Sequence, residues 1–177
     1  MHKNFNDFHS CNGNVIQPTR DELREFSRDR EITTTYSAAS FVSEIRSRSA
    51  EYTKNTIDQD LTLDDKEFLN ALYHHLSTRE LIQLDRVISA PSKPITMRVI
   101  IPKEFAHILY GWSMLLWDEG VVRKPDIVSI DIPDWPERRI IVDPGSGTNI
   151  ICGTDYIGEL KMSGLRLAMH LFNNDGG

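Results

Sequence analysis

The residues best suited to chemistry lie at the start of the last helix that the sequence predicts. Gly158 is followed there by Glu159 and Lys161, at the opening of a helix expected over about residues 156–172. The first N–H groups of a helix have no partner within it, and the helix dipole favours negative charge at that end. With the Lys161 ammonium, this turn would hold a carboxylate or a phosphate. The alternative is a solvated first turn in which Glu159 complements the dipole.

Other common reactive arrangements are absent from the sequence. The acidic stretch 58–65 fails the spacing of a calcium-binding EF-hand loop, because Leu63 stands where that loop needs its turn glycine. Cys11 and Cys152 form no Cys-x-x-Cys pair, and there is no Gly-x-Ser-x-Gly elbow. There is also no Gly-x-x-x-x-Gly-Lys-Ser/Thr pattern, which would cradle nucleotide phosphates. We therefore expect no bound metal ion and no cofactor in this chain.

The composition is that of an ordinary globular protein, with 177 residues of which 40% are hydrophobic and 26% charged. A net charge of -6 disfavours nucleic acids and anionic membranes as partners, because neutralising phosphates requires clustered basic side chains. No stretch approaches the roughly 20 apolar residues of a membrane span. The start of the chain has no apolar core and is not a signal peptide. We expect a cytoplasmic protein with no nucleic-acid and no membrane partner.

The spacing of apolar residues predicts an α/β (α+β) domain over residues 19–177, preceded by a polar, flexible leader, 1–18. Thr19 and Glu22 form a capping-box pattern at the first helix, and Asp64 is the expected cap of a later one. Helices are expected over about residues 20–29, 37–54, 64–76, 103–118 and 156–172. Strands are expected over residues 80–88, 96–101, 126–132, 139–144 and 148–154.

Residues 153–162, Gly-Thr-Asp-Tyr-Ile-Gly-Glu-Leu-Lys-Met, resemble a signature of the ATP-dependent phosphoenolpyruvate carboxykinases. That signature reads Gly-Thr-x-Tyr-x-Gly-Glu-x-Lys-Lys and likewise connects an apolar strand to a helix. Upstream segments match in the same order, so that the resemblance covers roughly residues 64–172, while 30–60 match loosely and 1–18 do not match. The resemblance implies a single domain similar to the family's N-terminal, substrate-binding domain, with a mixed sheet flanked by helices.

The resemblance also implies roles for particular residues. Those enzymes interconvert oxaloacetate plus ATP and phosphoenolpyruvate plus carbon dioxide, with metal ions assisting phosphoryl transfer. Tyr156 matches a tyrosine of the substrate site, although it is equally placed to pack at the helix entry. Lys161 matches the first lysine of the signature pair. Arg48 aligns with the arginine of a Gly-Arg-Ser-Pro motif that holds the substrate carboxylate, but the Gly and Pro are missing here.

Two departures from the family argue against catalysis by this chain alone. Met162 stands where the second lysine of the signature, a metal ligand, is expected, and a thioether is a poor ligand for Mg²⁺ or Mn²⁺. The family's metal-binding histidine strand, its phosphate-binding loop and its aspartate metal ligand have no counterpart in these residues.

Three functions remain open from the sequence. The first is a non-catalytic relative that acts as an interaction module or binds a small anion, a carboxylate or a phosphate. The second is the substrate-binding half of a carboxykinase whose nucleotide half is on another chain or was removed. The third is a structural or assembly subunit. For the first and the third we expect a protein partner or a homo-oligomer, because removing a neighbouring domain exposes apolar surface.

Overall fold

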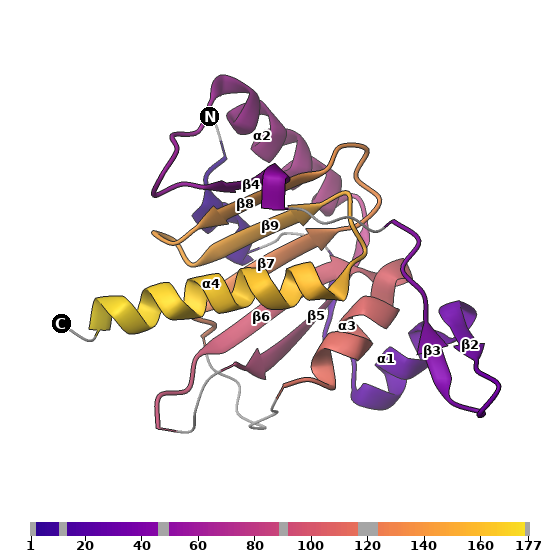
Figure 1. The fold of residues 1–177 in the computed structure, drawn as a ribbon. Coiled ribbons are helices and arrows are strands. Elements are labelled where there is room, and N and C mark those ends of the chain that lie inside the picture. The colour runs from indigo at the N-terminus through magenta and orange to yellow at the C-terminus, as the bar shows by residue number, and fades with distance from the viewer. Residues whose placement is uncertain (1–2, 11–13, 46–49, 89–91, 117–123, 176–177) are drawn as a thin grey trace.

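A mixed sheet of seven strands forms the centre of the part of the chain that is described (Figure 1). The computed structural model describes residues 3–10, 14–45, 50–88, 92–116 and 124–175. In chain order the strands of this sheet are β1 (Asn14–Ile16), β4 (Thr53–Asn55), β5 (Glu80–Val87), β6 (Thr96–Pro102), β7 (Ile127–Ile132), β8 (Arg139–Asp143) and β9 (Thr148–Cys152). They lie in the order β1-β5-β6-β7-β9-β8-β4, with β5–β6 and β8–β9 antiparallel and the other neighbours parallel.

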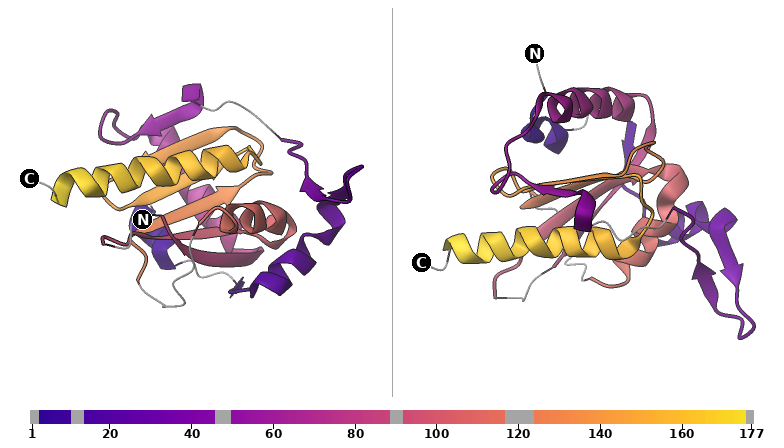
Figure 2. Two further views of the ribbon diagram at one scale, coloured as in Figure 1. Left: turned by 60° about the horizontal axis from the view of Figure 1, so that its bottom comes forward. Right: turned by 45° about the horizontal axis from the view of Figure 1, so that its top comes forward.

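Helices cover both faces of this sheet (Figure 2). They are η1 (Phe5–Ser10), α1 (Arg20–Phe26), η2 (Arg28–Arg30), η3 (Ala50–Tyr52), α2 (Leu63–Ser77), η4 (Lys103–Phe105), α3 (Ala106–Ser113) and α4 (Ile157–Asp175), where η marks 3₁₀ turns. α2 and η1 lie on one face, and α3 and α4 lie on the other, with α1 packed on α3. The expected α/β domain with a mixed sheet flanked by helices is confirmed. Among the described residues, no helix has both the length and the apolar character to cross a membrane.

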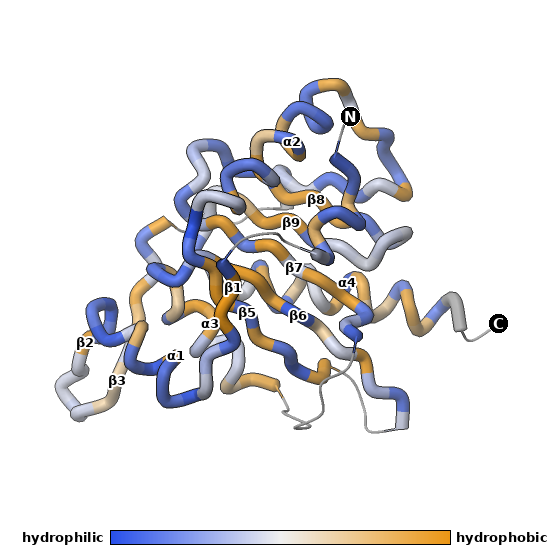
Figure 3. Tube along the Cα trace, turned by 180° about the vertical axis from the view of Figure 1, so that it is seen from behind, coloured by the Kyte–Doolittle hydropathy of each residue, from blue (hydrophilic) through white to orange (hydrophobic). Residues whose placement is uncertain are grey.

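Each face of the sheet carries its own apolar core. Successive side chains of a strand point to opposite faces, so neighbouring residues of one strand belong to different cores. Leu72 of α2 lies in the same cluster as Ile130 and Ile150. Trp112 of α3 lies in the other cluster, with Ile151. Figure 3 shows the largely hydrophobic central strands from behind.

Reciprocal hydrogen bonds fix where the first two α-helices begin. The Glu22 N–H donates to Thr19 Oγ1 at 3.3 Å and the Thr19 N–H donates to the Glu22 carboxylate at 2.8 Å, which confirms the predicted capping box. The predicted cap of the next helix, Asp64, is wrong. Thr62 is the cap instead, with its hydroxyl 3.1 Å from the Asp65 N–H and its own N–H 2.8 Å from the Asp65 carboxylate. An aspartate thus completes a box that usually contains Glu or Gln.

Two of the predicted helices are wrong in type or in length. The segment 37–54 contains the strand β3 (Ala39–Phe41), which pairs with β2 (Glu31–Thr33), and the strand β4, which pairs with β8. Pairing with strands far away in the sequence overrides a local helical spacing here. The helix expected over 103–118 begins with the 3₁₀ turn η4 and ends at Ser113.

The described part of the expected leader, 1–18, packs against the sheet. Phe8 of η1 is fully buried in the core beneath α2, and its ring lies edge-on to Tyr73. β1 joins the sheet as a parallel neighbour of β5. Two phenylalanines in a polar segment are enough to anchor it, because each buries a large apolar area.

Candidate functional site

The turn between β9 and α4 carries most of the residues that the sequence singled out. Gly153 leaves β9 with a φ of +75°, and a Cβ at this position would lie 2.7 Å from the Glu137 carbonyl oxygen. Glycine is therefore required at this crossing. The Gly153 N–H also donates to the Ile132 carbonyl at 3.1 Å. The turn is thus held against the carboxyl end of β7, and α4 starts from a fixed position.

Tyr156 and Gly158 lie together at the start of α4. A Cβ on Gly158 would come within 2.4 Å of the Tyr156 ring, so the ring lies across the glycine. Tyr156 is nevertheless 51% exposed, and its backbone N–H donates to the Thr154 hydroxyl at 3.2 Å. The tyrosine therefore both packs at the helix entry and presents its phenol to solvent.

Lys161 lies one turn further along α4 and is exposed. It borders a small hollow of about 90 Å³ between α3, α4 and β6, whose lining is mainly apolar. Within the described part of the chain Lys161 makes no ion pair, so its ammonium is available to a ligand. Arg48 lies outside the described residues, and its predicted role stays a prediction.

Asp155 was missed in the sequence analysis, and it connects this turn to a distant segment. Its carboxylate accepts a hydrogen bond from the Ser43 hydroxyl and another from the Glu44 N–H at 2.6 Å. Its own N–H donates to the Ile45 carbonyl at 2.9 Å. Burial on its own would raise the pKa of Asp155, but these hydrogen bonds lower the pKa below its usual value. Asp155 is therefore a charged anchor for the chain that leads towards Arg48.

A second buried carboxylate lies beneath the start of α4. Asp131 of β7 is 3% exposed, and no described residue makes a hydrogen bond to its Oδ1. Burial raises the pKa of Asp131 well above its usual value, and the charges of Asp155 and Glu159 raise it further. The side chain is thus protonated at pH values where an exposed aspartate is charged.

The negative charge of Glu159 is balanced by a residue of the same helix, α4. It accepts hydrogen bonds from Arg166 at 3.0 Å and from the buried Ser163 hydroxyl at 3.2 Å. Among the described residues, no three histidine, cysteine or carboxylate side chains are grouped so that they could hold a metal ion.

α4 carries a second apolar face that points away from the sheet. Four of its exposed side chains are hydrophobic and recur at intervals of three, four and three residues, which places them in one row on the helix. We call this row the α4 stripe; it consists of Met162 (45% exposed), Leu165 (44%), Met169 (57%) and Phe172 (38%). The sequence analysis missed the stripe because its residues alternate along the chain with buried apolar residues such as Leu167 and Ala168. From the sequence alone, the buried and exposed apolar residues cannot be separated into two faces.

Comparison with known proteins relates the chain to part of an enzyme. No protein-family model matches the chain. Over 147 residues it is 26% identical to the phosphoenolpyruvate carboxykinase (ATP) of Aeropyrum pernix. The match covers 83% of this chain but only 30% of that protein, so the chain spans less than a third of this relative's length. The relation agrees with the signature found in residues 153–162.

Proposed function

We propose that the chain is a non-catalytic, carboxykinase-like interaction module, and that the α4 stripe packs against a second copy of the chain. The observation that carries the proposal is the stripe itself, a row of hydrophobic side chains in solvent on the outer face of the last helix. Large contiguous patches of exposed apolar side chains mark interaction surfaces, whereas single exposed apolar residues are normal. Spacing of three and four residues is also the spacing with which two helices pack side by side.

Met162 connects the stripe with the loss of catalysis. Its position is that of the second lysine of the carboxykinase signature, and a methionine there removes a metal ligand and adds a flexible apolar side chain to the stripe. The same substitution therefore weakens a catalytic role and strengthens a binding role. A two-fold arrangement lets one stripe meet its copy, as in most homodimers.

The experiment compares two exposed methionines by sedimentation. Met169→Glu places a charge within the stripe, whereas Met114→Glu places the same charge at the end of α3, where Met114 is 53% exposed. We expect the wild type and Met114→Glu to associate to the same extent and Met169→Glu to remain a monomer. The circular dichroism spectra of the three proteins should be the same, which shows that each is folded. Equal association of both variants would contradict the proposal.

The turn at the start of α4 supports a small-anion site within the same module. Lys161, Gly158 and Tyr156 offer an ammonium, a backbone N–H of the first helical turn and a phenol to a carboxylate or a phosphate. The negative charge of Asp155 opposes such a ligand, so we expect weak binding. Lys161→Gln should abolish it, while Lys66→Gln on α2, another exposed lysine, should leave it unchanged.

A second candidate is the substrate-binding half of a carboxykinase whose nucleotide half is elsewhere. The retained tyrosine, glycine and first lysine of the signature favour it, together with the match to 30% of an ATP-dependent enzyme. Calorimetric titration with oxaloacetate, phosphoenolpyruvate and Mn²⁺-ATP separates the two candidates. Tight oxaloacetate binding without nucleotide binding favours the second candidate. Tight binding of Mn²⁺-ATP by this chain alone would contradict both.

A further inference from the structure

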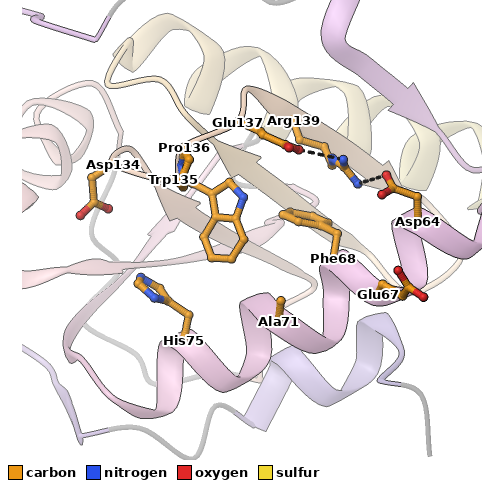
Figure 4. A pocket seen from close by; sticks show the side chains of 10 residues that line it. All are labelled: Asp64, Glu67, Phe68, Ala71, His75, Asp134, Trp135, Pro136, Glu137 and Arg139. Atoms are coloured by element: carbon orange, nitrogen blue, oxygen red, sulfur yellow. Dashed lines mark hydrogen bonds and ion pairs between the residues drawn. The ribbon is translucent and has the colours of Figure 1, made fainter.

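A hollow of about 650 Å³ lies on the α2 side of the sheet, between α2 and the loop from β7 to β8 (Figure 4). One wall is the outer face of α2, and the other is the loop from β7 to β8. Asp64, Phe68, Ala71 and His75 recur on α2 at intervals of four, three and four residues, so they lie in one row facing the loop. Nothing in the proposed function uses this hollow.

Three aromatic rings meet in the hollow. Trp135 of the loop stands edge-on to Phe68, with ring centroids 5.5 Å apart and an angle of 81°. It stands in the same way to His75, at 5.3 Å and 87°. Ala71 lies between these two residues on α2, and its short side chain also lines the hollow (Figure 4). We call Phe68, His75 and Trp135 the aromatic box.

The rim of the hollow is strongly acidic. Asp64, Glu67, Asp134 and Glu137 line it, and two guanidiniums stand against them: Arg139 pairs with Asp64 and Glu137, and Arg79 pairs with Asp134. Glu67 is exposed and makes no ion pair with any described residue, whereas Arg79 holds Asp134 at 2.9 Å. Burial lowers the pKa of His75, and the Arg79 charge lowers it further. The imidazole that lines the hollow is therefore uncharged at neutral pH. The field inside the hollow therefore favours a positive ligand.

The protein already places one cation of its own in this environment. The Arg139 guanidinium lies over the Phe68 ring, 4.6 Å from its centroid. It also pairs with Asp64 at 2.9 Å and with Glu137 at 3.0 Å. Arg139 thus lies between an aromatic ring and two carboxylates. An external cation would find a similar combination of aromatic rings and a carboxylate at Trp135, His75 and Glu67.

We propose that this hollow binds a small organic cation, an ammonium or guanidinium head on a short apolar stem. The head lies against the aromatic box and near the Glu67 carboxylate, and the stem lies in the space above Ala71. Aromatic faces attract cations through their quadrupole, and the attraction grows where water is partly excluded. An anion is disfavoured by the four carboxylates, and a neutral ligand gains nothing from them.

The experiment follows the indole N–H resonance of Trp135 in NMR spectra during titration with four probes. Choline and agmatine carry the two kinds of head group, and the uncharged isostere of choline, with a tert-butyl group in place of the trimethylammonium, is the matched control. We expect saturable shifts with a cation and none with the isostere. N-acetyl-arginine amide carries the guanidinium on a peptide backbone, and it should bind more weakly than agmatine. Equal responses to choline and its isostere, no response to either cation, or tighter binding of the arginine amide would overturn the proposal.

Three variants test the position of the ligand without removing a buried side chain. Ala71→Leu fills part of the hollow from an exposed helical position, so we expect the fold to be kept and the affinity to fall by about tenfold or more. Glu67→Gln should weaken binding by about threefold. Glu25→Gln on α1, in an exposed ion pair with Arg28, is the control and should leave binding unchanged. Unaltered affinity in Ala71→Leu would overturn the proposal.

Discussion

The two outer helix faces of this molecule differ in what they present to solvent. α4 presents a row of partly exposed hydrophobic side chains, while α2 and the loop from β7 to β8 present carboxylates around three aromatic rings. Such an apolar row is stabilised by burial against another protein surface. A charged hollow with aromatic walls is stabilised by a small ligand of opposite charge. The comparison suggests a module with one face for a protein and one for a small molecule.

The faces of the central strands differ in a related way. Towards α2, the side chains of β7 and β9 are mostly apolar, with Ile130, Ile132 and Ile150 in one core, and the buried Thr148 hydroxyl has His9 as a hydrogen-bond partner. Towards α4, the same strands bury polar side chains. These are Ser129, Asp131 and Asn149, each with a polar atom that makes no hydrogen bond to any described residue. Unsatisfied buried polar groups cost stability, so the α4 side of the sheet is the less optimised side.

The largest expected effect is a difference in the free energy of unfolding between substitutions on the two faces of α4. Leu167 is 1% exposed and packs on the sheet, whereas Leu165 is 44% exposed and belongs to the α4 stripe. Leu167→Ala should lower the free energy of unfolding of the monomer by about 2–5 kcal/mol, because it leaves a cavity. Leu165→Ala should lower it by less than about 1 kcal/mol. Urea unfolding at low protein concentration measures both, and similar losses would show that the stripe is not a free surface.

The next effect concerns pH and the α4 side of the sheet. The pKa of Asp131 is higher in the folded protein than in the unfolded chain, so the folded state keeps a proton that the unfolded state releases. The stability contributed by this group is full below the unfolded pKa and is lost as the pH rises towards the folded pKa, by about 1.4 kcal/mol per pH unit. Asp131→Asn removes this dependence.

Urea unfolding at several pH values tests this sign. We expect the free energy of unfolding of Asp131→Asn, relative to the wild type, to rise between about pH 4 and pH 7. The reference variant is Asp21→Asn on α1, which makes the same substitution at an exposed aspartate. A flat difference for Asp131→Asn would show that this carboxyl is charged when folded.

The smallest effect tests the cap of α2, which frames the acidic hollow. Asp65 completes the box with Thr62 and also pairs with Lys54, whereas Asp64 is largely exposed. Asp65→Ala should lower the free energy of unfolding by about 1–2 kcal/mol, and Asp64→Ala should lower it by less than about 0.5 kcal/mol. Calorimetric unfolding of the two variants measures both losses. Equal losses would contradict the assignment of Asp65 to the capping box.

The sequence predicted the second half of the fold well because its signals there are local. The strands from Glu80 to Cys152 are short apolar runs between proline and glycine turns, and the last helix follows a recognisable turn. The first half depends on distant partners. β4 exists because β8 lies beside it, and η1 is ordered by the burial of Phe8 beneath α2. No window of the local sequence contains those partners.

The candidate site shows the same division. Tyr156, Gly158 and Lys161 are close in the sequence and stay close in space, so the motif alone located them. Asp155 and Asp131 come from different elements, and the sequence does not reveal that their charges interact. The aromatic box likewise joins α2 to a loop some 60 residues later, Phe68 and His75 against Trp135, and only the fold brings these rings together.

The central claim is that α4 packs against a second copy of the chain, and the mass of the wild-type chain in solution tests it most directly. Sedimentation equilibrium should show the mass rising with concentration from 20.3 kDa towards twice that value, and falling back on dilution. A mass that stays at 20.3 kDa at every concentration would contradict the account.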